Sequence, residues 1–360
     1  MVQLRPTQKQ SYRRDAWLEI NLDNLEFNLK NLYAEFNKPL IPVLKADAYG
    51  HGAVMIAKVL DAYDFVHGYG VASVDEALSL REASKKPIIV LSVSPEWAME
   101  QALENDIELT IVDLESAKKL NQIAKEMGKS ANVHIKFDTG MNRIGFRYED
   151  RQDVFEIEKL ECLKIQSLFT HFVDAIDTDY AIYQYQQFRT FITGLKYPVH
   201  PSSSQAARSV SDMEADYIRC GIELYGLENL ELRPLLSLKA RISFIKTINK
   251  GETVSYKRTW VASENTRIAT LPLGYADGVP RSLSSKIVGQ VKSHEIKQVG
   301  LITMDQMMFD IASADIQVGD VVDLLTEDLP VAAWAEAAGT ISYEIVSALN
   351  LRLPKTYTRN

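Results

Sequence analysis

The sequence has few cysteines and no long apolar run. Only Cys162 and Cys220 occur in 360 residues, and this pair provides neither the ligand spacing of a metal site nor a disulfide framework. No stretch reaches the roughly 18 apolar residues that a membrane-spanning helix needs. The basic residues near the start are not followed by the apolar core of a secretory signal. We therefore expect a cytoplasmic protein without a metal and without a membrane partner.

The sequence also lacks an excess of positive charge. It has 40 Lys and Arg against 48 Asp and Glu, a net charge of −8, which argues against a nucleic-acid partner. The composition, 46% hydrophobic and 24% charged, is ordinary for a globular protein and leaves no room for extensive disorder. A chain of 360 residues exceeds the usual size of one domain, so we expect two domains and leave small-molecule chemistry open.

Strand patterns alternate with helical patterns between residues 40 and 222. Eight such units over about 200 residues predict a (β/α)8 barrel, because a doubly wound sheet usually has five or six strands. In such a barrel the active site lies at the carboxyl ends of the strands. The predicted strands are Leu40–Leu44, Phe65–Val71, Ile88–Leu91, Glu108–Val112, Val133–Phe137, Ile165–Phe169, Pro198–His200 and Tyr217–Ile222, and the predicted helices include Val74–Ser84, Leu114–Met127 and Asp179–Leu195.

Beyond Leu238 the pattern changes to period-2 runs separated by glycine and charged turns. This pattern predicts a separate, mostly β domain. We place the barrel at residues 12–238 and the β domain at residues 239–360. The predicted strands of the second domain are Ala240–Ile248, Arg267–Leu273, Ile287–Val291, Gln298–Met304 and Val321–Leu325.

A further strand is predicted near the start of the chain. Trp17–Leu22 alternates like a strand but has no place among the eight barrel strands, so the segment 1–22 is a candidate to join the β domain. Asp23 is predicted to cap the helix that follows.

The stretch Val43–Gly52 reads Val-Leu-Lys-Ala-Asp-Ala-Tyr-Gly-His-Gly and follows the first barrel strand. Its glycines mark a turn into a predicted helix, Ala53–Leu60. Lys45 stands at the strand's carboxyl end, where partial desolvation lowers a lysine pKa and frees the amine to form a Schiff base with a carbonyl compound. Pyridoxal phosphate is the commonest such compound. On position alone, a solvated lysine at a strand end is the favoured interpretation of Lys45.

These ten residues closely resemble the cofactor-lysine signature of the alanine racemases, a family of pyridoxal-phosphate enzymes. Further matches run in order from residue 17 to residue 343, so the resemblance covers nearly the whole chain. It implies an isomerase that interconverts L-alanine and D-alanine by a two-base mechanism and supplies D-alanine for cell-wall peptidoglycan. It also implies a homodimer whose active sites are shared between the subunits.

A phosphate group in a barrel commonly sits in the loops after strands 7 and 8. Here strand 7 leads into Ser202-Ser203-Ser204, and strand 8 itself contains Cys220-Gly221-Ile222. Serines before a helix are also plain helix caps. In the resemblance, Ser203 replaces an asparagine and Cys220 a proline, which puts the cofactor affinity in question. The residues that match the family's phosphate-binding positions are Tyr49, Ser204, Gly221, Ile222 and Tyr343.

Two residues match family positions beside the cofactor ring. Arg219 resembles the arginine placed against the pyridine nitrogen, and His171 the histidine beside the ring. An arginine stays protonated and leaves the ring a weaker electron sink, which disfavours decarboxylation and transamination. A buried structural arginine and a core histidine are the alternatives.

The segment Lys136-Phe137-Asp138-Thr139-Gly140-Met141-Asn142-Arg143 ends the fifth predicted strand. By resemblance, Arg143 hydrogen-bonds the cofactor's phenolic oxygen and helps to hold the substrate carboxylate. Lys136 matches a lysine that is carbamylated in many members, although an unmodified lysine fits the sequence equally. Asn142 replaces the usual glycine, which puts the backbone angle of this loop in question.

Racemisation removes a proton from one face of Cα and delivers one to the other, so a second acid or base is needed. The β domain supplies Gly274-Tyr275-Ala276-Asp277-Gly278, which resembles the family's catalytic-tyrosine motif and also reads as a β-turn. In the family, Tyr275 and the residues that match Met304 and Asp305, near the substrate carboxylate, come from the opposing subunit. The alternatives are a racemase for serine or another small amino acid, a fold-related decarboxylase and a non-catalytic pyridoxal phosphate carrier.

Overall fold

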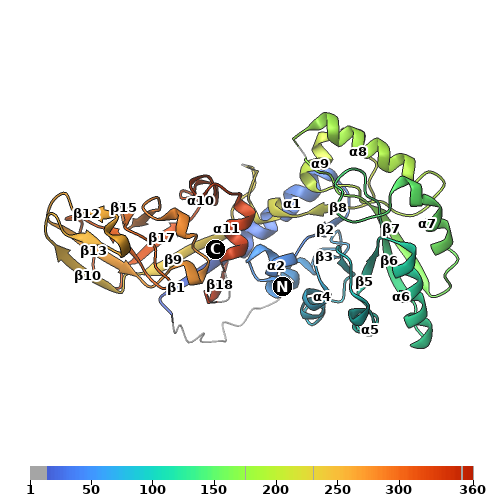
Figure 1. Cartoon of the computed structure of the whole chain (residues 1–360), viewed down its shortest axis with the longest axis horizontal. Helices are drawn as coiled ribbons and strands as arrows, with labels where there is room; N and C mark the ends of the chain where they lie inside the picture. Colours follow the sequence, from blue (N-terminus) through green and yellow to red (C-terminus); the bar gives the residue numbers. More distant parts are fainter. Residues whose placement is uncertain (1–13, 175, 230, 350–351, 360) are drawn as a thin grey trace. The chain divides into compact units, whose positions relative to one another are not determined.

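The computed structural model describes residues 14–174, 176–229, 231–349 and 352–359. The chain splits into two compact units (Figure 1): Asn24–Arg233 forms one, and Met1–Asp23 together with Pro234–Asn360 forms the other. We call them the barrel unit and the β unit. The sequence places the boundary at residue 238, inside strand β9 (Leu236–Arg241), because the period-2 pattern becomes visible only within that strand.

The barrel unit closes a ring of parallel segments. Strands β3 to β7 form a five-stranded sheet in sequence order, and β2 pairs with β8. A bridge between Val43 and Gly70 joins β2 to β3, and a bridge between Leu168 and Val199 continues the ring beyond β7. The strands are β2 (Leu40–Pro42), β3 (Tyr69–Val71), β4 (Ile88–Val90), β5 (Glu108–Ile111), β6 (Ala131–Lys136), β7 (Leu163–Phe169) and β8 (Ile218–Cys220).

Two predicted barrel strands need correction. Pro198–His200 is not a regular strand, because Pro198 and Pro201 have no N–H to donate and the pairing is reduced to the bridge at Val199. The eighth strand ends at Cys220, since the chain turns at Gly221 into the 3₁₀ turn Ile222–Tyr225. The (β/α)8 barrel itself is confirmed, because all eight segments take their expected places in the ring.

Helices surround these strands, and Figure 1 shows α4 to α8 on their outer side. Side chains cap several helices: Ser73 accepts from the Glu76 amide at α4, and Asp113 accepts from the Ser116 amide at α6. Asp23 is not the cap of the first helix, because Asn21 Oδ1 accepts from the Asp23 amide. The helices are α1 (Leu22–Phe36), α2 (Lys45–Tyr49), α3 (Ala53–Leu60), α4 (Val74–Arg81), α5 (Glu96–Glu104), α6 (Leu114–Glu126), α7 (Arg151–Ile157), α8 (Thr178–Phe191) and α9 (Ser204–Ser209).

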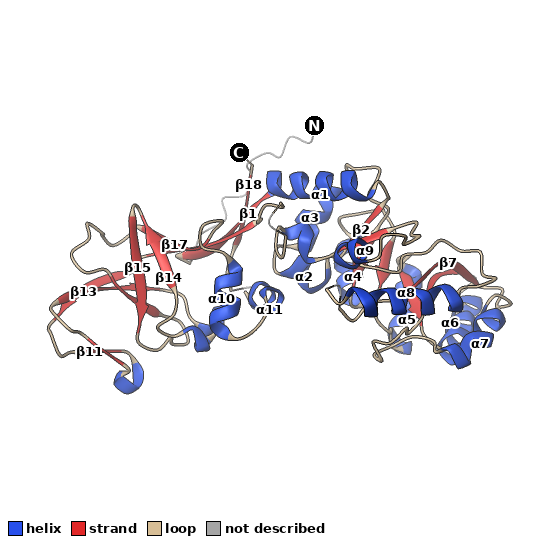
Figure 2. Ribbon diagram, turned by 90° about the horizontal axis from the view of Figure 1, so that it is seen from above, coloured by secondary structure: helices blue, strands red, loops and turns tan. Residues whose placement is uncertain are grey.

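The β unit contains a nine-stranded sheet in the order β10-β13-β16-β15-β14-β17-β9-β1-β18. Strand β1 (Ala16–Asn21) pairs antiparallel with β9 and parallel with β18. Figure 2 shows helices α10 (Val331–Ala338) and α11 (Ser342–Ala348) beside each other at this sheet. The other strands are β10 (Phe244–Ile248), β13 (Thr266–Leu271), β14 (Val288–Val291), β15 (His294–Val299), β16 (Met307–Asp310), β17 (Val321–Leu325) and β18 (Lys355–Thr358), and β11 (Thr253–Val254) and β12 (Trp260–Val261) form a separate pair.

The prediction of Gln298–Met304 as a strand was wrong. Strand β15 ends at Val299, and Gly300 adopts a left-handed φ of 72° that turns the chain away. The run Ala240–Ile248 is likewise interrupted between β9 and β10. Within the described ranges, no helix is both long enough and apolar enough to cross a membrane.

Candidate active site

The residues after Lys45 form a left-handed helical turn, a conformation that L-residues rarely adopt. Ala46, Asp47, Ala48 and Tyr49 have φ values of 52° to 55°. The turn is hydrogen-bonded like a helix, since the Ala48 amide donates to Leu44 O and the Gly50 amide to Ala46 O. Each non-glycine residue costs roughly 1–2 kcal/mol in this conformation. The surrounding structure must therefore hold the turn in place.

Two carboxylates hold this left-handed turn, one at its start and one between the turn and the helix that follows. Glu76 on α4 accepts from the Ala46 amide with one oxygen and from the Ala72 amide with the other, each at 2.7 Å. The Asp47 side chain accepts from the amide of Ala53, the first residue of α3. The turn thus joins β2 to α3 with Lys45 at its first position.

His51 supports the turn from the buried side. Its Nδ1 lies 3.0 Å from Ala48 O and 2.9 Å from Tyr49 O, and because carbonyl oxygens only accept, Nδ1 carries the proton. The His51 ring stacks on Tyr225, whose hydroxyl donates to Val43 O at the end of β2. These contacts connect the turn to the barrel wall.

Five basic side chains gather at the carboxyl ends of the barrel strands. Burial lowers the Lys45 pKa, the charge of Arg143 lowers it further, and Glu76 opposes the shift. Burial also lowers the His171 pKa well below its usual range, followed by the charges of Arg219, Lys136, Arg143 and Lys45. His171 is therefore neutral near pH 7, and it lies within a cationic cluster that the other four predicted residues form, namely Lys45, Lys136, Arg143 and Arg219.

Lys136 lies at the end of β6 and is almost fully buried. Its Nζ lies 5.1 Å from the centre of the Phe169 ring and, among the described residues, makes no hydrogen bond or ion pair. Burial, followed by the charges of Arg219 and Arg143, lowers the Lys136 pKa to about 7. Much of this amine is therefore unprotonated near neutral pH.

Asp138 shapes the loop that carries Arg143. Its Oδ1 accepts from the Gly140 and Asn142 amides and its Oδ2 from the Arg143 amide. Asn142 has a left-handed φ of 56°, a value that asparagine tolerates better than other non-glycine residues. Asn142 therefore adopts a left-handed conformation of the kind that a glycine at this position would allow.

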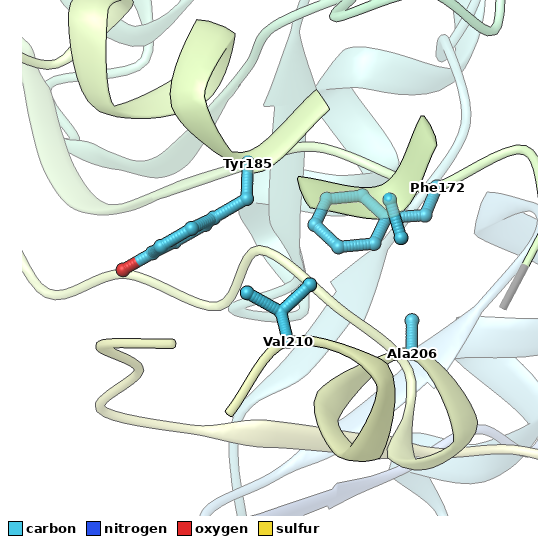
Figure 3. Close-up of a cluster of buried hydrophobic side chains, with 5 residues drawn as sticks. Phe172, Tyr185, Ala206 and Val210 are labelled. Atoms are coloured by element: carbon cyan, nitrogen blue, oxygen red, sulfur yellow. The ribbon is translucent and has the colours of Figure 1, made fainter. Parts of the chain in front are cut away.

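His171 is positioned by α8. The buried amide of Gln184 donates to His171 O, and its oxygen accepts from the Val173 amide, so Gln184 holds the backbone on both sides of Phe172. Figure 3 shows Phe172 facing Tyr185 of α8 and lying near Ala206 of α9 and Val210. Together with Ala181 these side chains form a buried apolar cluster. The cluster ties the His171 segment to the helix that begins at Ser204.

The predicted phosphate-binding residues of the barrel unit also converge. A Cβ atom built at Gly221 would lie 3.3 Å from Tyr49 Oη, so the tyrosine hydroxyl rests against the bare backbone of Gly221. Ser203 caps α9 by accepting from the Ala206 amide, which leaves Ser204 as the first residue of the helix. Ser202 Oγ is buried and, within the described part of the chain, has no hydrogen-bond partner. Ile222 is buried at the start of the 3₁₀ turn.

The predicted residues of the β unit form a second group. Tyr275 begins a one-turn 3₁₀ helix and is 41% exposed. Its amide donates to Thr303 O and the Ala276 amide donates to Met304 O, so the tyrosine turn lies directly against the loop that carries Met304 and Asp305. Gly274 permits this approach, since a Cβ there would collide with the carbonyl oxygens of Thr303 and Met304. Tyr343, also in the β unit, lies half-buried on α11.

An ion-pair network holds the tyrosine turn. Asp277 is fully buried and binds both terminal nitrogens of Arg14, at 2.6 Å and 2.7 Å. Its Oδ2 also accepts from the Gly274 amide, which closes the turn around Tyr275. Arg352 connects Asp277 with Asp305, 3.4 Å and 2.7 Å away. We call Arg14, Asp277, Arg352 and Asp305 the tyrosine-turn network.

Both units of the chain match domains of a known protein family. The family model of the alanine racemase N-terminal domain matches residues 20–229, and that of the C-terminal domain matches residues 235–357. The chain belongs to the alanine racemase family. It is 38% identical to the alanine racemase of Clostridium perfringens, over 96% of each chain.

Solved alanine racemases have the same fold. The alanine racemase of Clostridium difficile 630 superposes with a TM-score of 0.91 at 36% identity, over 96% of each chain. The alanine racemase of Bacillus anthracis with bound L-Ala-P superposes with a TM-score of 0.88 at 32% identity, also over 96% of each chain. These matches confirm the family, the barrel and the C-terminal domain that the sequence predicts.

Several residues that shape this candidate site were not predicted. Glu76, Asp138 and Gln184 act through backbone groups, and their sequence positions carry no distinctive pattern. Asp277 lies inside the tyrosine motif, but its partner Arg14 is more than 250 positions away in sequence. Only the folded chain shows these pairings.

Proposed function

We propose that the protein binds pyridoxal phosphate and interconverts L-alanine and D-alanine by a two-base mechanism in a homodimer, thereby supplying D-alanine for cell-wall peptidoglycan. The observation that carries the proposal is the lowered pKa of Lys45 within the cationic cluster at the carboxyl ends of the barrel strands. A lysine with a lowered pKa presents a free amine to an aldehyde. The surrounding cations suit a ligand that carries a phosphate.

The residues present fit this cofactor. The buried Ser202 hydroxyl has no hydrogen-bond partner among the described residues. Gly221 leaves a space next to the Tyr49 hydroxyl, and the side chain of any other residue at position 221 would fill that space. Arg219 contacts no carboxylate within the described ranges, so an anionic ligand nearby would balance its charge. We assign the phosphate to Tyr49, Ser204, Gly221, Ile222 and Tyr343.

Pyridoxal phosphate supplies an electron-withdrawing ring that makes the Cα hydrogen of a bound amino acid acidic. Lys45 holds the cofactor at rest and moves the proton on one face of Cα, and Tyr275 of the partner subunit moves it on the other. With the cofactor bound, Arg219 would serve as a permanent donor to the ring nitrogen, His171 would lie beside the ring, and Arg143 would hold the substrate carboxylate.

Two further assignments complete the proposed site. Met304 and Asp305 of the partner subunit lie near the substrate carboxylate, because the tyrosine turn that places Tyr275 packs against their loop. Lys136 takes up carbon dioxide: its neutral Nζ bonds to the carbon and loses a proton, which yields a carbamate anion. The Lys136 pKa of about 7 and the nearby Arg143 and Arg219 charges support this modification.

The deciding experiment supplies L-alanine to the purified protein with pyridoxal phosphate and measures D-alanine, with L-serine in parallel. D-alanine formation supports the proposal; serine racemisation alone indicates the other small-amino-acid racemase. A protein that binds the cofactor but converts neither amino acid is a non-catalytic carrier.

Two variants test the assigned bases. Lys45→Ala should abolish the visible absorbance of bound cofactor, whereas Lys58→Ala on the exposed side of α3 should retain it. Tyr275→Ala should slow proton removal from one enantiomer more than from the other, with Tyr256→Ala, an exposed tyrosine of the same unit, as the control. Equal losses in both directions for Tyr275→Ala would contradict the two-base mechanism.

A further inference from the structure

A continuous chain of buried hydrogen bonds leads from Arg219 through the barrel interior. Arg219 Nη1 lies 2.7 Å from His200 Nδ1, and His200 Nε2 lies 2.7 Å from Ser167 Oγ. Ser167 Oγ lies 2.6 Å from His134 Nδ1, and His134 Nε2 lies 2.8 Å from Glu108 Oε2. All five residues are at most 7% exposed, so these contacts are shielded from water.

The chemistry of Arg219 fixes the direction of every bond in this chain. An arginine only donates, so His200 Nδ1 must accept and the His200 proton must be on Nε2. His200 Nε2 therefore donates to Ser167. The Ser167 hydroxyl then donates to His134 Nδ1, which leaves the His134 proton on Nε2, facing the acceptor-only carboxylate of Glu108.

The other protonation states conflict with these contacts. A proton on His200 Nδ1 would oppose the Arg219 N–H group, donor against donor. A doubly protonated His134 would leave the Ser167 hydroxyl without an acceptor, because the two histidines are its side-chain partners in the described part of the chain. Burial, followed by the Arg219 charge, also lowers the His200 pKa well below its usual range, which agrees with a neutral ring.

Arg219 needs this support because its charge is buried without a carboxylate beside it. Its other partners are the carbonyl oxygens of Thr170, His200 and Pro201. Burial lowers the Arg219 pKa to about 9, so the side chain remains cationic near neutral pH. Keeping this charge away from water costs desolvation free energy. An uncompensated buried charge is costly, and aligned hydrogen bonds that end at an anion reduce that cost.

We infer that Glu108, His134, Ser167 and His200 are positioning residues for Arg219 and form a one-directional relay, which we call the barrel relay. It begins at Glu108, the first residue of β5, crosses β6 and β7, and ends on β8 at the guanidinium. The relay holds the guanidinium in one orientation and couples its charge to a distant carboxylate. Its effect on the cofactor ring rests on the role proposed above for Arg219; its bond directions do not.

The bond directions are tested by nitrogen-15 NMR of the full-length protein with labelled histidine, of which the chain has six. We expect the ring protons of both His134 and His200 to be on Nε2, as the hydrogen-bond directions require. Ser167→Ala should shift the ring resonances of both histidines. Thr110→Val is the matched control, because Thr110 is a buried hydroxyl on β5 that donates to Val90 O, outside the relay. A proton on Nδ1 of either ring, or equal shifts in the two variants, would overturn the relay.

The coupling to Arg219 is tested with pyridoxal phosphate labelled at its ring nitrogen. Ser167→Ala and Glu108→Gln should each change the nitrogen-15 shift of the ring nitrogen and lower kcat about tenfold with little change in KM, the scale typical of a lost supporting partner. Thr110→Val should change neither. Unchanged values in Ser167→Ala refute the coupling even if Glu108→Gln fails to fold. Correct histidine tautomers in a protein that binds no cofactor would refute the proposed function and leave the bond directions standing.

Discussion

The pairing of Arg14 with Asp277 should be the main electrostatic contact that fixes the tyrosine turn. Breaking a buried ion pair costs about 3–5 kcal/mol when one charge is left uncompensated. Asp277 is fully buried, but the Arg14 side chain is 21% exposed and regains some hydration when the pair is broken. We therefore expect Arg14→Met to reduce the free energy of unfolding by about 2 kcal/mol.

Asp277→Asn should cost more than Arg14→Met, about 3 kcal/mol. It removes the charge that Arg14 and Arg352 share and weakens the bond from the Gly274 amide, which is stronger to a carboxylate than to a neutral amide. The double variant should cost little more than Asp277→Asn alone, so the coupling energy between the two sites should be about 2 kcal/mol.

The assay is thermal unfolding of the two single variants and the double variant at one protein concentration, followed by circular dichroism. At roughly 2–4 °C per kcal/mol, Arg14→Met should lower the melting temperature by about 6 °C. Arg352→Met is the matched control, because its side chain is 42% exposed and its ion pairs should contribute under about 1 kcal/mol. A coupling energy below about 0.5 kcal/mol, or an Arg352→Met cost equal to that of Arg14→Met, would refute the reasoning.

Three other substitutions or conditions test the barrel unit. Bicarbonate labelled with carbon-13 should give a carbamate NMR signal that grows from pH 6 to pH 8, as the Lys136 amine loses its proton around its pKa of about 7, and Lys136→Met should lack the signal. Gly221→Ala should weaken pyridoxal phosphate binding about tenfold in a titration, because its Cβ would lie 3.3 Å from Tyr49 Oη. Ala46→Gly should raise the urea midpoint by an amount equivalent to about 0.5–1 kcal/mol, because glycine adopts the left-handed φ without a steric cost; an unchanged midpoint would show that the turn is not strained there.

The barrel could be predicted from the sequence because each of its helices and strands is specified by residues close together in the chain. The helices Ala53–Leu60 and Leu114–Met127 and most barrel strands follow from short patterns of apolar residues and caps. The failures arise where backbone geometry is set from outside the segment. Pro198–His200 carries an extended pattern, but its flanking prolines remove the donors that a regular strand needs, and Gln298–Met304 is interrupted by the turn at Gly300.

The sequence allowed us to propose which residues belong to the candidate site, but not how their side chains are arranged. The resemblance led to the prediction of Lys45, Arg219 and Tyr275 as site residues because each lies in a short contiguous motif. Glu108 and Ser167 could not be found in this way, since the barrel relay and Arg219 require the register of five neighbouring segments around the ring. A one-residue slip of β6 against β7 would turn His134 away from Ser167, so the relay is a property of the closed barrel.

The left-handed turn and the barrel relay provide two different ways of holding a cation in the cluster. Lys45 stands before strained backbone that Glu76 and His51 clamp through main-chain groups, so its Nζ keeps its freedom to exchange protons and partners. Arg219 is instead held through its own guanidinium, by four neutral acceptors. A group that must form and break a bond needs a fixed backbone and a free side-chain end, whereas a group that must keep its proton needs its side-chain end fixed. The geometry thus suits the two roles proposed for these residues, Lys45 as the base and Arg219 as the permanent donor, which is the division of roles that racemisation without side reactions requires.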